Sequence, residues 1–312
     1  MSRAGLPVRE SLKAVAGHPP ICGVQGLAAH GEVDRSAIIN RKAGIESEGS
    51  LKMRILFIGD IVGSPGRKIV HDRLRDILAQ REIDLCIANG ENSASGFGIT
   101  PRLAEELFAS GIEVLTGGNH IWDRKEIFDF FPHEPRLLRP ANFPNGLPGT
   151  GLYIGLARNG TSYAVVNLQG RTFMAPLDDP FRTALRELEK IPPNVRVIVV
   201  DMHAEATSEK QAMGWYLDGK VSAVVGTHTH VATADQRVLP GGTAYITDAG
   251  MTGPHDSVIG MEKQGVLHRF LDGLPSRFAV AEGDVQMNAV LIEVDEAGGR
   301  ARSIERLNYH LD

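Results

Sequence analysis

The fold of this chain is decided by the stretch MRILFIGD, residues 53–60. Its run of apolar residues, 55–58, is typical of a strand that is buried on both faces, and Asp60 follows where this strand should end. Short apolar runs then alternate with stretches of helical period along the rest of the sequence. This alternation predicts βαβ units and an α/β protein in which helices cover a sheet.

The expected strands and helices follow one another without an internal repeat. The expected strands are residues 55–58, 85–88, 113–116, 163–168, 195–200, 221–225, 244–247 and 289–294. The expected helices are residues 67–80, 101–110, 181–190, 208–217 and 262–271. Two helix starts carry capping residues: Thr100 precedes Pro101, and Asp123 with Glu126 resembles a capping box.

Residues 1–52 differ from the rest of the chain. They have scattered charge, several glycines and prolines, and no sustained hydrophobic period. We expect either an N-terminal extension that is disordered or weakly ordered, or a start that is assigned too early, with Met53 as the natural first residue. The globular domain is then expected at residues 53–312.

Composition limits the classes of function. With 42% hydrophobic and 23% charged residues, the chain has the makeup of an ordinary globular protein. A net charge of -5 and a pI near 6.1 argue against binding of long nucleic acid, so a phosphate-bearing substrate would need local positive charge, for example from a metal. Cys22 and Cys86 form neither a metal-ligand pair nor a disulfide framework. With no run of roughly 18 apolar residues and no signal peptide, we expect a cytoplasmic protein with no membrane partner.

Unusual polar residues fall directly after the expected strands. The carboxyl ends of strands line the ligand crevice of open α/β sheets, so these residues are expected to converge. In chain order they are Asp60, Glu91, Asn92, Asn119, His120, His203, His228 and His230.

Each of these residues has a structural explanation when it is taken alone. Asp60 could cap a helix or form a turn, Asn119 could occupy a turn, and His203 could be a hydrogen-bonded core histidine. His228 and His230 are harder to explain in this way, because two imidazoles at i and i+2 beyond a buried strand can both face one ion or an ion pair. Together, the clusters predict a metal site.

The ligand types select the class of metal. Histidine nitrogens with Asp, Glu and Asn oxygens, and no thiolate, suit iron, manganese or zinc. The seven candidates Asp60, Glu91, Asn92, Asn119, His203, His228 and His230 are more than one ion needs, so two ions are expected. Glu91 is our choice for a carboxylate that bridges them.

In the order of these motifs, the chain resembles the calcineurin-like metallophosphoesterases. Val62 stands where most members have a metal-binding histidine, and Glu91 stands where they have a bridging aspartate. With these two departures, the segments GDIVG at 59–63 and TDAGMTGP at 247–254 resemble the bacterial YmdB family of metallophosphoesterases. The resemblance extends from about Met53 to the C-terminus and leaves out residues 1–52.

The resemblance implies a four-layer α-β-β-α sandwich of two mixed sheets. It implies a metal-dependent phosphodiesterase that hydrolyses small cyclic nucleotides such as 2',3'-cyclic AMP by attack of a metal-bridged hydroxide, with iron as the first choice of metal. It also implies self-association into a homo-oligomer. Carried over residue by residue, one ion is held by Asp60, Glu91, Asn92 and His230, and the other by Glu91, Asn119, His203 and His228.

His120 is the candidate catalytic residue. It is adjacent to Asn119 but is not needed as a ligand, so we assign it as the general acid that protonates the leaving oxygen. The alternative is that it orients a metal ligand. Two other functions stay open: a phosphomonoesterase or nuclease with the same metals, and a metal-dependent regulatory protein with little turnover.

Overall fold

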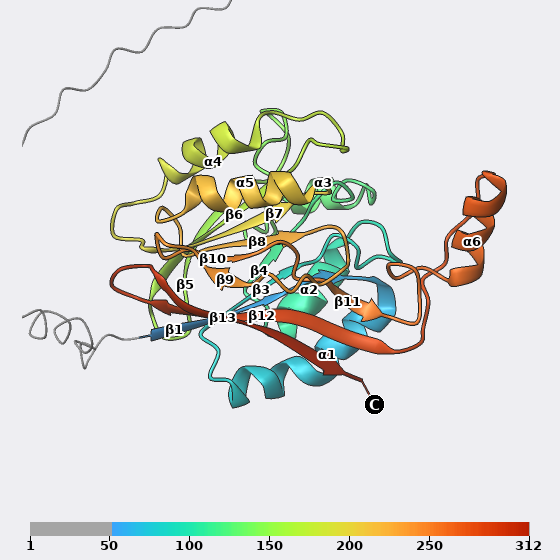
Figure 1. Ribbon diagram of the computed structural model, residues 1–312, viewed down its shortest axis with the longest axis horizontal. Coiled ribbons are helices and arrows are strands. Elements are labelled where there is room, and N and C mark those ends of the chain that lie inside the picture. The colour runs from blue at the N-terminus through green and yellow to red at the C-terminus, as the bar shows by residue number, and fades with distance from the viewer. Residues whose placement is uncertain (1–51, 312) are drawn as a thin grey trace, which may run out of the picture. The chain divides into compact units, whose positions relative to one another are not determined.

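Two mixed β-sheets form the frame of the protein, whose computed structural model describes residues 52–311 (Figure 1). The first sheet has the strand order β2-β11-β12-β1-β3-β4, with β13 paired to β12. Its strands are β1 (Lys52–Ile58), β2 (Asp60–Ile61), β3 (Leu85–Asn89), β4 (Val114–Thr116), β11 (Met251–Pro254), β12 (Val285–Asp295) and β13 (Ala301–His310). The predicted extension at residues 1–52 lies outside the described residues except for Lys52.

The second sheet has the strand order β5-β6-β7-β8-β10-β9. Its strands are β5 (Leu152–Leu156), β6 (Ser162–Gln169), β7 (Val197–His203), β8 (Ala223–Thr227), β9 (Arg237–Val238) and β10 (Ala244–Ile246). Strands β6, β7, β8 and β10 run parallel to one another, so their carboxyl ends meet at one edge. The α/β prediction is confirmed. The sequence pattern missed β2, β5, β9, β11 and β13, which are short or largely exposed.

The two sheets pack face to face, and helices cover their outer faces (Figure 1). β1 shows why: Ile55 and Phe57 lie in the core between the sheets, while Leu56 and Ile58 pack in the core that includes Leu74. The run at residues 55–58 is therefore buried on both sides, as its composition predicts. The helices are α1 (Gly63–Gln80), α2 (Pro101–Ala109), α3 (Ile127–Phe130), α4 (Pro180–Leu188), α5 (Thr207–Leu217) and α6 (Lys263–Asp272).

The layer between the sheets changes from apolar to polar along the strands. In β7, Val197 and Val199 belong to the core between the sheets, and Asp201 and His203 follow at the same two-residue spacing. Side chains two apart in a strand share a face, so these polar groups extend the same layer. The neighbouring strand ends supply Asn89, Thr116, Asn167, Gln169 and Thr227, all buried. A buried polar zone thus closes the carboxyl end of the core.

The two predicted helix caps have different outcomes. Thr100 does cap α2, and its hydroxyl accepts a hydrogen bond from the backbone of Leu103. The capping box at Asp123 and Glu126 is wrong, because α3 begins after Glu126 and has no side-chain cap. Asp123 contacts His120 instead.

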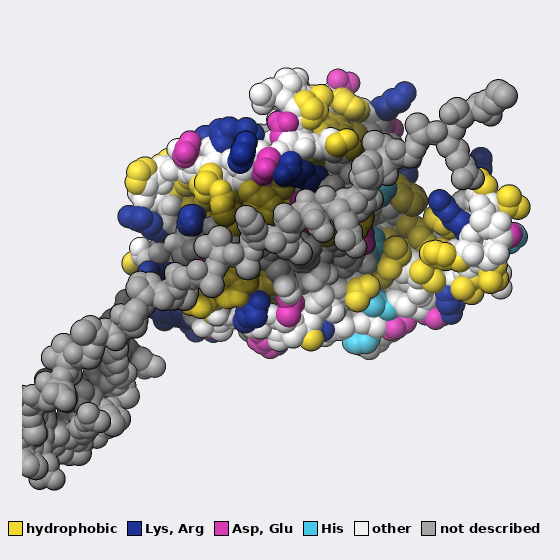
Figure 2. Space-filling model, turned by 45° about the horizontal axis from the view of Figure 1, so that its top comes forward, with side chains coloured by type: hydrophobic (Ala, Val, Ile, Leu, Met, Phe, Trp, Pro, Cys, Tyr) yellow, Lys and Arg dark blue, Asp and Glu magenta, His cyan; other side chains and the backbone are white. Residues whose placement is uncertain are grey.

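α6 projects away from the two sheets (Figure 1). Leu267, Phe270 and Leu271 of this helix are exposed, and Figure 2 shows hydrophobic side chains gathered on the lobe that carries it. None of the helices in residues 52–311 has the length and apolarity needed to cross a membrane.

Candidate metal centre

The structure brings all seven predicted ligands together at the polar end of the core. Asp60 follows β1, His203 ends β7, and the others lie in the loops after β3, β4 and β8. Asp60, Glu91 and His203 are fully buried. Asn92 is almost as buried, and Asn119, His228 and His230 are partly exposed.

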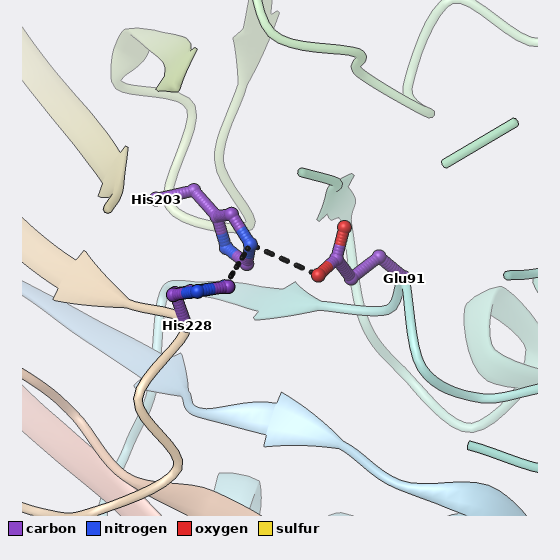
Figure 3. Close-up of side chains that lie close together, drawn as sticks. All are labelled: Glu91, His203 and His228. Atoms are coloured by element: carbon purple, nitrogen blue, oxygen red, sulfur yellow. Dashed lines mark hydrogen bonds and ion pairs between the residues drawn. The ribbon is translucent and has the colours of Figure 1, made fainter. Parts of the chain in front are cut away.

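His203 is the centre of one group of potential ligand atoms (Figure 3). Its Nε2 lies 2.9 Å from Oε1 of Glu91, 3.0 Å from Oδ1 of Asn119 and 3.1 Å from Nδ1 of His228. One ligand atom each from Glu91, His203 and His228 lies within 4.8 Å of the others, which is close enough for one metal ion. Gly118 makes room for this ring, since a Cβ there would lie 2.2 Å from His203 Nε2.

A second group of atoms surrounds His230. Its Nε2 lies 3.1 Å from the side-chain amide of Asn92 and 3.8 Å from Oδ1 of Asp60. The other oxygen of Asp60 accepts a hydrogen bond of 3.1 Å from the backbone N–H of His228. Asp60 is therefore held at one oxygen, and its second oxygen faces the imidazole of His230.

Two buried oxygens in this site have no hydrogen-bond partner. They are Oδ1 of Asp60 and Oε1 of Glu91, although the Glu91 oxygen has an ion pair of 2.9 Å with Nε2 of His203. Buried carboxylate oxygens normally find a donor or a cation, because leaving one unpaired is costly. Oxygens and imidazole nitrogens without thiolates are the ligands that iron, manganese and zinc accept. The residues present therefore fit a metal centre.

Electrostatics divide the site into charged and neutral members. Burial acts against a charge on His203, but the carboxylates of Glu91 and Asp60 outweigh it and raise the pKa of His203 to about 9. Burial would raise the pKa of Glu91, but the nearby His203 outweighs it and lowers that pKa to about 2. Burial and the charge of His203 lower the pKa of His228 to about 3. His228 is thus neutral at pH 7, the form in which an imidazole binds a metal.

A buried carboxylate stands behind His203. Thr227 lies between them: its Oγ1 is 2.9 Å from Nδ1 of His203 and donates a 2.7 Å hydrogen bond to Asp201. Asp201 also accepts hydrogen bonds from Asn89 and from the hydroxyl of Thr116. With Nδ1 held in this way, Nε2 of His203 is directed to the ligand atoms. The outer partners of metal-binding histidines have this arrangement.

His228 has a carboxylate partner of its own. Its Nε2 lies 3.1 Å from Oε2 of Glu205, while its Nδ1 faces His203. Glu205 is half exposed, and it is not among the site residues predicted from the sequence. Its place two residues after His203, just beyond the end of β7, is a signal that could have found it.

His120 lies beside the cluster, at its outer edge. Its backbone N–H donates a 2.9 Å hydrogen bond to Glu91, and its Nδ1 lies 2.8 Å from a carboxylate oxygen of Asp123. The ring packs edge-on against Phe97, with 5.1 Å between the ring centroids. Asp123 and Phe97 together therefore orient this ring.

The site opens into a cavity of about 890 Å³. Its polar end is formed by four of the candidate ligands, Glu91, Asn92, His228 and His230, together with His120 and Glu205. Its other end is apolar and comes largely from α6 and the segments on either side of it. The apolar lining residues are Phe97, Val258, Ile259, Met261, Val266, Phe270 and Phe278, and Arg269 lies among them.

Comparison with known proteins identifies the family. Residues 56–307 match the family model described as YmdB-like protein. The chain belongs to the YmdB-like family. The family predicted from the sequence motifs is confirmed.

Relatives of this YmdB-like protein carry phosphoesterase names. It is 52% identical over 255 residues to a Bacillus subtilis protein named 2',3'-cyclic-nucleotide 2'-phosphodiesterase, and the match covers 82% of this chain and 96% of that protein. A Mycoplasma genitalium protein named as a putative phosphatase/phosphodiesterase is 35% identical, over 83% of this chain and 94% of that one.

Solved structures share the fold of this YmdB-like protein. A hypothetical protein from Thermus thermophilus has a TM-score of 0.78 at 44% identity, covering 83% of this chain and 100% of that chain. A phosphatase from Mycoplasma pneumoniae has a TM-score of 0.79 at 32% identity, covering 85% and 95%.

Proposed function

We propose that this YmdB-like protein is a dinuclear-metal phosphodiesterase that hydrolyses small cyclic nucleotides such as 2',3'-cyclic AMP. The observation that carries the proposal is the buried Oδ1 of Asp60, which has no hydrogen-bond partner, in a cluster with Glu91 and three imidazoles. The name of the Bacillus subtilis relative supports this substrate class. We also infer that residues 53–312 form the four-layer α-β-β-α sandwich of a metallophosphoesterase domain.

The two groups of ligand atoms support two sites for ions. We assign Asp60, Glu91, Asn92 and His230 to one ion and Glu91, Asn119, His203 and His228 to the other. Iron is the first choice, and manganese and zinc are the alternatives. When bound, such ions lower the pKa of a water molecule and neutralise phosphate oxygens.

The chain's own contribution to the chemistry centres on His120. Asp123 engages its Nδ1, so Nε2 is the nitrogen that can donate a proton to the leaving ribose oxygen. Phe97 packs against the ring and limits its movement. The backbone N–H of His120 also binds Glu91, which ties the position of this acid to the metal-binding cluster.

The cavity suits a nucleotide better than a bare phosphate. Its volume of about 890 Å³ exceeds the size of a phosphate group, and its far end is lined by aromatic and aliphatic side chains. A nucleobase has an apolar face that can lie against such a wall. A cyclic phosphate at the polar end would then place the base toward the apolar end.

A phosphomonoester is the second candidate substrate, because the Mycoplasma relatives are named as phosphatases or phosphatase/phosphodiesterases. Both reactions use the same cluster, so the substrates must be compared directly. A regulatory protein with little turnover is the alternative outside catalysis.

The test starts from protein that is purified without added metal. Bound metals are counted by elemental analysis, and 2',3'-cyclic AMP, bis-p-nitrophenyl phosphate and a phosphomonoester are assayed side by side. We expect about two metals per chain and turnover of both diesters. Less than one metal after supplementation, with no diester turnover, would overturn the proposal. His203→Ala is the matched inactive control.

A further inference from the structure

The loop that carries His228 and His230 has an unusual backbone. Both residues have positive φ, 99° for His228 and 63° for His230, and only Thr229 separates them. Residues with a Cβ adopt this conformation rarely, and they keep it only where the surrounding structure holds them. Contacts from outside the loop are therefore needed to hold this backbone, and Thr229, between the two histidines, is where they are made.

Asp248 holds this residue. One of its carboxylate oxygens, Oδ2, accepts hydrogen bonds from the backbone N–H of Thr229 at 3.1 Å and from its hydroxyl at 2.8 Å. The same oxygen accepts a 2.7 Å bond from Nζ of Lys210 on α5, and Oδ1 accepts a 2.8 Å bond from the backbone of Gly250. Both oxygens of Asp248 are thus used.

The charges of this network are shielded from solvent. Lys210 and Asp248 are both fully buried. Nζ of Lys210 lies 2.7 Å from Oδ2 of Asp248, and hydrogen bonds to a charged acceptor are stronger than those to a neutral one. A charged acceptor is therefore directed at the residue between the two histidines.

Asp248 is itself fixed against the loop. Its backbone is hydrogen-bonded to Thr233, and the backbone N–H of Ala249 donates to Gly226. The two segments lie so close that a Cβ on Gly226 would be 1.7 Å from the carbonyl oxygen of Thr247. The network has little room to relax.

We propose that Lys210, Asp248 and Thr229 form a positioning network that fixes His228 and His230 in their metal-binding arrangement. The inference rests on the proposed metal site, but it concerns residues outside the set of proposed ligands, and of these only Thr229 lines the cavity. The positions of His228 and His230 then depend on the buried ion pair between Asp248 and Lys210, and Lys210 lies on α5. In this respect α5 is part of the site.

The test uses Thr229→Val, which removes the hydroxyl bond and keeps the shape, with Thr229→Ser as the conservative rescue. Thr243→Val is the matched control, because Thr243 is a buried threonine whose hydroxyl bonds the backbone of Val221, away from the ligands. We measure Mn²⁺ affinity, thermal unfolding with EDTA, and amide hydrogen exchange of residues 226–233 with EDTA.

We expect Thr229→Val to weaken Mn²⁺ binding roughly 10- to 100-fold and to speed exchange in residues 226–233, with Thr229→Ser near the wild type. Thr243→Val should lower the unfolding temperature but leave Mn²⁺ affinity and the exchange of residues 226–233 unchanged. Wild-type affinity and exchange in Thr229→Val would overturn the inference. If the wild type binds none of iron, manganese and zinc, the proposed function fails, and the exchange data in EDTA still decide whether the network holds the loop.

Discussion

His203 and the pair His228 and His230 reach the same site by different structural routes. His203 ends the regular strand β7, fully buried, and its place is set by the ladder to β6 and β8. His228 and His230 lie beyond the end of β8, in a loop with positive φ at both positions. One proposed ligand is held by the sheet, and two are held by a loop.

The difference shows what each kind of ligand needs around it. The sheet fixes the backbone of His203, so Thr227 and Asp201 need only orient the ring. The loop cannot fix its own backbone in this conformation, so Lys210 and Asp248 must hold it. Glu205 then orients the ring of His228. Three substitutions test this division, and a fourth tests the catalytic assignment beside it.

The largest effect is expected at His120, which lies outside both regions. His120→Ala should reduce kcat by roughly 10²- to 10⁴-fold, because the proton donor is lost. Metal content should stay unchanged, since neither group of ligand atoms is altered. Steady-state kinetics and elemental analysis check both points. An equal loss of metal would mean that His120 supports a ligand, as in the alternative assignment.

On the loop side, Lys210→Met should destabilise the protein by about 3–5 kcal/mol, because it leaves the charge of Asp248 buried and unpaired. Lys220→Met is the control: Lys220 is exposed, and the same change there should cost less than about 0.5 kcal/mol. Urea unfolding measures both. Similar values for the two variants would show that the buried pair contributes little.

On the strand side, Thr227→Val should cost about 1–3 kcal/mol, since Asp201 loses a donor within the core. Hydrogen exchange of the backbone around His203 should change less than exchange of residues 226–233 changes in Thr229→Val. Thr227→Ser should restore stability. If Thr227→Val speeds exchange at the end of β7 as much as Thr229→Val speeds it in residues 226–233, the sheet alone does not fix the backbone of His203.

The smallest effect is expected at Glu205. Its carboxylate is half exposed, so water competes for its hydrogen bond with the neutral His228, and Glu205→Gln should change stability by less than about 0.5 kcal/mol. Metal affinity should fall less than in Thr229→Val, because the amide oxygen still accepts a hydrogen bond from His228. A larger loss of metal affinity in Glu205→Gln than in Thr229→Val would show that the orientation of the His228 ring matters more than the loop backbone.

The sequence predicted the central strands and the residue types of the site. Buried runs such as residues 55–58 are local signals, and the polar residues at their ends follow from the same pattern. The chain order of the polar motifs indicated the calcineurin-like superfamily, and Val62, Glu91 and the segments 59–63 and 247–254 indicated the family. Edge strands such as β5 and β13 were missed, since their partly exposed residues lack a strong apolar pattern.

Asp123 shows how a local pattern can mislead. Its spacing to Glu126 is that of a helix cap, and sequence alone favours that local partner. In the folded chain Asp123 binds His120, and α3 begins later without a side-chain cap. Two partners compete for the same carboxylate, and which one it binds is decided by packing.

The sequence by itself thus determined which ligand types the protein carries and at which strand ends, because burial period and residue chemistry are local properties. Only the tertiary structure decided what holds those ligands. Lys210 and Asp248 are 38 residues apart, and Thr227 and Asp201 are 26 apart. No local pattern encodes such pairs, since they exist only when the sheet brings distant segments together and removes water from between them.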